Sequence, residues 1–128
     1  MRRVVVTGMG CVTPIGNDVA SFWEGLKAGK CGIGPITHFD TENYKAKVAA
    51  EVKDFDPLQY MEKSELRKYD VFCQYAMAAA TQAVEESGVK GTLPPERIGT
   101  YFGSGIGGMH TFAEEQKTLM EKGPRRVS

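Results

Sequence analysis

The feature that most restricts the fold is a run of β-forming residues, Ile98–Phe102, which is followed by four glycines within the six residues 103–108. A helical pattern follows directly, with Met109 and Phe112 on one face. Glycines at such a junction allow backbone angles that other residues avoid, and they let a ligand or another segment come close. A strand that leads through a glycine turn into a helix is a common way to build a site in an α/β protein. The sequence therefore predicts a strand–turn–helix unit around 103–108.

The remaining segments alternate as an α/β domain requires. Val4–Val6 is a short β-branched run ended by glycine, which suits a strand covered on both faces, as in a parallel sheet. We expect helices over 19–26, behind a cap at Asn17 or Asp18, and over 58–68, 70–87 and 107–122, with a further strand at 47–52. This order predicts one α/β domain over 1–128, with an irregular insertion at about 31–57 and a parallel sheet.

The segment 70–87 carries the strongest helical pattern. Ala76, Ala79 and Ala83 line one side of it. Because alanine side chains are small, the helix is predicted to lie close against a neighbour, and Gly88 is its expected end.

Three interpretations of the glycine turn remain open from the residues alone. Gly103, Gly105 and Gly108 match the G-x-G-x-x-G fingerprint of a dinucleotide site. That fingerprint also requires an acidic residue about 20 positions later at the end of the next strand, whereas Glu121 falls in a predicted helix. The glycines otherwise make a tight turn only, or they line a cavity for an extended acyl or thioester group. Sequence spacing does not separate these last two.

Bulk properties exclude several classes of protein. Sixteen basic and sixteen acidic side chains cancel, which argues against a nucleic-acid partner or a membrane surface. No apolar run approaches the about 20 residues of a membrane helix, and no signal peptide is recognisable, so we expect a cytoplasmic protein. Cys11, Cys31 and Cys73 are an odd number without metal spacing and suit reduced thiols, and His38 and His110 are too few to predict a metal site.

Motifs spread in order along the chain carry a resemblance to a known family. The chain resembles the β-ketoacyl-[acyl-carrier-protein] synthases, and is most similar to the elongating synthases II of bacterial fatty-acid synthesis. The matching motifs include Arg2–Gly10, Thr13–Asn17, Gly32–Pro35, Arg67–Asp70, Gly103–Gly108 and Gly123–Arg126.

The resemblance implies a thiolase-like fold, of which this chain is the incomplete N-terminal half, with a mostly parallel sheet and packed helices. It implies a homodimer that extends acyl chains by decarboxylative condensation with malonyl groups, both delivered by acyl carrier protein. No metal or nucleotide cofactor is implied. Family members are much longer, so part of the apolar surface is expected to be exposed when these residues stand alone.

The resemblance assigns no catalytic residue to this chain. In the family the nucleophilic cysteine, two histidines and a lysine lie beyond the position that matches Ser128, so residues 1–128 alone are expected to be inactive. Ser104 sits between glycines, but a nucleophile elbow needs a further glycine where Phe102 stands.

The resemblance gives two groups of residues a binding role. Gly105, Ile106, Gly107 and Gly108 are predicted to bind substrate, because Ile106 matches a position that borders the acyl-chain pocket. The alternative is that they serve turn packing alone.

Lys63, Arg67 and Lys68 form a basic cluster predicted to dock the acidic carrier protein. The alternative is a solvated charged face, since Glu62 and Glu65 lie among them.

Two rival functions remain beside the condensing enzyme, namely a non-catalytic carrier-binding module and a dinucleotide-binding oxidoreductase fragment.

Overall fold

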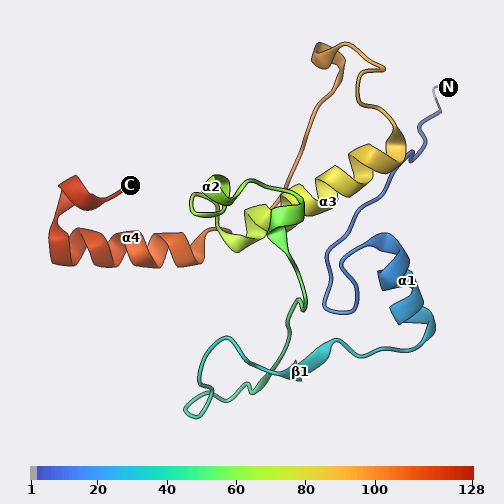
Figure 1. Cartoon of the computed structure of the whole chain (residues 1–128). Coiled ribbons are helices and arrows are strands. Elements are labelled where there is room, and N and C mark those ends of the chain that lie inside the picture. Colours follow the sequence, from blue (N-terminus) through green and yellow to red (C-terminus); the bar gives the residue numbers. More distant parts are fainter. Residues whose placement is uncertain (1–2) are drawn as a thin grey trace.

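The computed structural model describes residues 3–128, and α3 lies at the centre of it (Figure 1). In the view of Figure 1, α1 and β1 lie below α3, and α4 extends to the left from the start of α3. In chain order the elements are α1 (Val19–Lys27), β1 (Ile33–Pro35), β2 (Val48–Ala50), the short helical turn η1 (Pro57–Gln59), α2 (Lys63–Leu66), α3 (Val71–Ser87), the turn η2 (Pro95–Arg97), α4 (Met109–Lys122) and the turn η3 (Pro124–Arg126).

The ends of the long helices are where the sequence predicts them. Asp18 is the cap of α1, and its carboxylate accepts the Ser21 N–H at 2.7 Å. Gly88, which ends α3, has φ of 61°, in the left-handed region that favours glycine. These predictions are confirmed because each depends on local chemistry.

The prediction of one helix over 58–68 is wrong, because the structure divides this segment into two short elements. Asp56 caps η1 by accepting the Leu58 N–H at 3.0 Å. A second start forms at Glu62, whose N–H donates to the Glu65 carboxylate at 3.1 Å, and α2 begins there. Two separate caps therefore give two short elements in place of one helix.

The main correction to the fold concerns the predicted parallel sheet, which the described residues do not form. The described residues contain only a two-stranded antiparallel hairpin, in which Ile33 of β1 pairs with Ala50 of β2. The expected strand at 47–52 is confirmed as β2, but Val4–Val6 and Ile98–Phe102 are not strands in the structure. A strand needs a neighbour to receive its backbone hydrogen bonds, and neither segment has one within residues 3–128.

Few apolar side chains are buried. Met61 and Ala78 are the buried hydrophobic residues of the described range, whereas Val4 is 91% exposed and Tyr101 97% exposed. The expectation of exposed apolar surface is therefore confirmed. No helix within residues 3–128 combines the length and the apolar character needed to cross a membrane.

The alanine face of α3 packs against the segment that follows Val4–Val6. A Cβ atom added to Gly8 would overlap the Ala83 carbonyl, and one added to Gly10 would overlap the Ala79 carbonyl. The close neighbour predicted for this helix is thus the backbone of the glycine-containing segment 8–10. Small residues on both sides make the approach possible.

Candidate functional site

The glycine loop, residues 103–108, connects an extended segment to α4. Gly108 is the N-cap residue of α4 and has φ of 70°, which a residue with a side chain rarely adopts. Ile106 is 79% exposed and stands at the surface of the loop. The four residues predicted to bind substrate therefore lie together, with one large apolar side chain presented outward.

The loop rests on the first turn of α3. A Cβ atom added to Gly107 would lie 2.6 Å from Cζ of Phe72. Real Cβ atoms do not come this close to a ring carbon, so a larger residue at 107 would require the Phe72 ring to move. Close approach, and not only turn geometry, therefore explains the glycine at 107.

Asp70 joins the starts of α3 and α4. Its Oδ1 accepts the Val71 N–H at 2.7 Å, and its Oδ2 accepts the N–H and the hydroxyl of Thr111, each at 3.0 Å. The Thr111 N–H is the main cause that lowers the pKa of Asp70, and the Thr111 hydroxyl, the Val71 N–H and His110 act in the same direction. The carboxylate is therefore held in its charged form between two helix starts.

An apolar hollow of about 350 Å³ lies beside this junction. Phe72, Cys73 and Met77 of α3 line it together with Phe102, the residue that precedes the glycine loop. Ile106 is not among its lining residues. The loop thus adjoins an apolar space large enough for part of an acyl group, while Ile106 itself faces solvent.

The predicted docking residues are only partly gathered. Lys63, Arg67 and Lys68 are all exposed and lie on α2 or directly after it. Arg67 and Lys68 line a hollow of about 570 Å³ that also contains Asp70 and His110, whereas Lys63 does not line it. Within residues 3–128 the salt bridges join other pairs, so the three cations are not neutralised inside the chain.

The three cysteines are free thiols with different surroundings. Burial, and then the Asp18 carboxylate, raise the pKa of the Cys11 thiol, which is the opposite of what a nucleophile needs. Cys31 is exposed, and Cys73 is half-buried in α3. Across the part of the chain that the structure describes, no group of three or more His, Cys, Asp or Glu residues is arranged to hold a metal ion.

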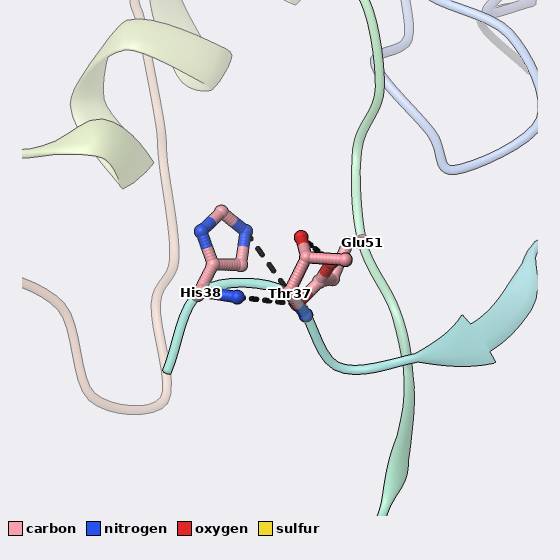
Figure 2. A network of polar contacts seen from close by, with 3 residues as sticks. All are labelled: Thr37, His38 and Glu51. Atoms are coloured by element: carbon pink, nitrogen blue, oxygen red, sulfur yellow. Dashed lines mark hydrogen bonds and ion pairs between the residues drawn. The ribbon is translucent and has the colours of Figure 1, made fainter. Parts of the chain in front are cut away.

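A polar network outside the glycine loop escaped the sequence analysis. Figure 2 shows Thr37, His38 and Glu51 gathered in one network. The Glu51 carboxylate accepts the Thr37 hydroxyl at 2.7 Å and the Thr37 N–H at 3.0 Å, and it lies 3.8 Å from His38 Nε2. The Thr37 hydroxyl is the main cause that lowers the pKa of Glu51. Thr37 and Glu51 follow different strands, and spacing alone does not indicate that their side chains meet.

Comparison with known proteins identifies close relatives over the whole chain. The model of the beta-ketoacyl synthase N-terminal domain matches residues 1–128. The chain is 51% identical over 128 residues to 3-oxoacyl-[acyl-carrier-protein] synthase 2 of Vibrio cholerae serotype O1, covering 99% of this chain and 31% of the relative. It is 47% identical over 129 residues to the protein of the same name from Coxiella burnetii, with the same coverage. The chain thus spans about a third of the length of the curated relatives it matches.

Two solved structures share the fold. The ishigamide ketosynthase/chain length factor gives a TM-score of 0.75 at 34% identity, over 98% of this chain and 32% of that chain. A type II PKS acyl-carrier protein in complex with its ketosynthase gives 0.78 at 28% identity, over 100% of this chain and 33% of that chain. In the described residues no strand leads directly into the glycine loop, so the strand that the dinucleotide fingerprint requires is missing there.

Proposed function

Because the chain belongs to the beta-ketoacyl synthase N-terminal domain family, we propose that it is the N-terminal part of a condensing enzyme of fatty-acid synthesis. The observation that carries the proposal is the identity of 51% to a 3-oxoacyl-[acyl-carrier-protein] synthase 2 over 99% of this chain. The proposed enzyme is an acyltransferase that extends an acyl chain carried on acyl carrier protein.

The proposed reaction has two stages. An active-site cysteine attacks the thioester of acyl carrier protein, takes the acyl group and releases the carrier thiol. The malonyl group on a second carrier loses carbon dioxide, and the resulting carbanion attacks the enzyme-bound thioester and expels the cysteine thiolate. The product is a 3-oxoacyl chain that is two carbons longer, and no metal or nucleotide takes part.

The residues of this chain are assigned to binding and not to bond-making. The raised pKa of Cys11 makes that thiol a poor nucleophile. The resemblance to the longer synthases implies that the nucleophilic cysteine lies beyond residues 1–128. The proposal includes a homodimer and a cytoplasmic location. The three free thiols agree with the location, because thiols stay reduced in the cytoplasm.

The glycine loop is assigned to the acyl group. Gly107 and Gly108 hold the backbone close to Phe72, Gly105 belongs to the same loop, and Ile106 presents an apolar side chain toward the growing chain. An exposed side chain of this size costs free energy in water unless an apolar partner covers it, which favours contact with an acyl group.

The basic cluster is assigned to the carrier protein. Lys63, Arg67 and Lys68 are exposed cations without a salt bridge in the described range, which favours an acidic partner. One structural relative is a ketosynthase solved with its acyl-carrier protein. The same observation supports a second candidate function, a module that binds carrier protein without catalysis.

One experiment separates these two functions. The intact polypeptide, meaning the native polypeptide that carries residues 1–128, is incubated with acyl and malonyl carrier proteins, and the products are identified by mass spectrometry. The condensing enzyme releases carbon dioxide and forms a 3-oxoacyl carrier protein. The binding module retains carrier protein in a pull-down but leaves both thioesters unchanged, and this result would overturn the first proposal.

A further inference from the structure

We propose that Asp70 and Phe72, at the start of α3, are positioning residues that hold Ile106 in place and so set which acyl chain lengths the enzyme accepts. The inference rests on the proposed function, because it assumes that the glycine loop contacts the acyl group. Asp70 is assigned no contact with substrate and acts through the loop, whereas Phe72 supports the loop and also lines the apolar hollow beside it.

The first step concerns the start of α4. The first amides of a helix have no partner within it, and an N-cap side chain usually accepts from one of them. Gly108, the N-cap residue of α4, has no side chain that does so. Asp70 Oδ2 accepts the Thr111 N–H at 3.0 Å instead, so a residue from another helix supplies the missing cap.

That borrowed cap ties the glycine loop to α3. The same carboxylate accepts the Val71 N–H at 2.7 Å through its other oxygen, so one side chain caps both helices. The Thr111 hydroxyl adds a third hydrogen bond at 3.0 Å. Because α4 begins directly after the loop, the loop cannot leave α3 without breaking the two bonds to Thr111.

The second step concerns the ring of Phe72. The loop backbone at Gly107 lies so close to this ring that a Cβ atom there would be 2.6 Å from Cζ. Ile106 is the preceding residue, and its side chain is 79% exposed. Its place is therefore determined by the ring under Gly107 and by the cap at the start of α4.

Charged groups around Asp70 favour the ionised carboxylate. Arg67, Lys68, His110 and Glu115 line the same hollow as Asp70, and three of these four groups are cations when protonated. The hydrogen bonds from Thr111 and Val71 lower the pKa of Asp70 in the same sense. The cap is thus present at neutral pH.

The test uses chain-length selectivity in the intact polypeptide. The ratio of kcat/KM for a long and a short acyl carrier protein is measured for the native protein and for Asp70→Ala, Thr111→Val, Thr111→Ser and Phe72→Leu. Asp70→Ala, Thr111→Val and Phe72→Leu are expected to change this ratio by about threefold or more, because a misplaced pocket residue alters the fit of methylene groups. Thr111→Ser keeps both hydrogen-bond donors and is expected to retain the native ratio.

Asp18→Ala is the matched control, since it removes a helix cap of the same chemistry from α1. It is expected to lower stability and to leave the ratio unchanged. An equal change of the ratio in Asp18→Ala would overturn the inference, because general loosening would then explain the effect. If Asp70→Ala does not fold, Thr111→Val tests the second bond to the same carboxylate, because it removes the Thr111 hydroxyl and keeps the backbone N–H.

Ile106→Ala separates this inference from the proposed function. A changed ratio in Ile106→Ala with native ratios in Asp70→Ala, Thr111→Val and Phe72→Leu overturns the positioning role alone. A native ratio in Ile106→Ala overturns the acyl-binding role of the loop, and the inference with it.

Discussion

Gln82 Oε1 on α3 accepts a hydrogen bond from the Cys11 N–H at 3.0 Å. The amide nitrogen of the same side chain donates to the Asn17 carbonyl at 2.7 Å and to the Tyr60 hydroxyl at 3.2 Å. One side chain therefore joins α3 to two segments that are distant in the sequence, residues 11–17 and Tyr60, within a chain that buries few apolar residues.

We expect Gln82→Ala to lower the free energy of unfolding by about 1–3 kcal/mol, because it leaves one partly buried donor and two acceptors without partners. The matched control is Gln116→Ala, at an exposed position of α4, which is expected to change stability by less than about 0.5 kcal/mol. The measurement is urea unfolding of the intact polypeptide. Equal effects of the two substitutions would contradict the account of Gln82.

We expect Gly10→Ala to lower stability by about 1–3 kcal/mol, because the new methyl group overlaps the Ala79 carbonyl and pushes the segment 8–10 off α3. Gly34→Ala is the control, since a Cβ atom there has no atom within 4 Å. Thermal unfolding of both variants measures the difference. Native-like stability in Gly10→Ala would show that the segment is not packed as described.

The Thr37–Glu51 contact is expected to depend on pH. The pKa of Glu51 is lowered, so its contribution to stability is fully present above the pKa of an unfolded glutamate and is lost as the pH falls through the folded value. We expect Thr37→Val to raise the pKa of Glu51, since the Thr37 hydroxyl is the main cause of the shift. Carboxyl NMR titration measures it, and an unchanged pKa of Glu51 would refute this network.

Charge reversal in the basic cluster is expected to weaken binding of carrier protein. The triple substitution of Lys63, Arg67 and Lys68 by glutamate should reduce affinity by about tenfold or more at low salt, because it replaces attraction to an acidic partner by repulsion. Lys68→Glu and Lys90→Glu form a matched pair, since both lysines are exposed but only Lys68 belongs to the cluster. Surface plasmon resonance measures the affinity for carrier protein. Equal losses of affinity in Lys68→Glu and Lys90→Glu would contradict the prediction, because net charge alone would then explain the effect.

The sequence predicted the helices better than the sheet, and the reason is physical. Asp18 and Gly88 act within one or two turns of their own helices, so their effect can be inferred from neighbouring residues. Val4–Val6 has the composition of a strand, but a strand forms only where another segment supplies hydrogen bonds. Pairing partners are non-local, and composition does not identify them.

The candidate site shows the same division. The glycine loop leads into α4 as the motif predicts, while the substrate-binding role of Gly105, Ile106, Gly107 and Gly108 stays a prediction. The hydrogen bonds between Asp70 and Thr111 span 41 positions, and no spacing rule indicates that one aspartate caps two helices. Such contacts depend on how α3 and α4 meet, which is decided by tertiary packing.

The central claim is that the glycine loop contacts the acyl chain of a condensing enzyme. The most direct measurement uses an acyl carrier protein whose chain ends in a photoreactive group, irradiated with the intact polypeptide and analysed by tryptic mass spectrometry. We expect the label on the peptide 98–117, at or beside Ile106, and we expect competition by unlabelled acyl carrier protein to remove it. Labelling confined to other peptides, with 98–117 unmodified, would contradict the account.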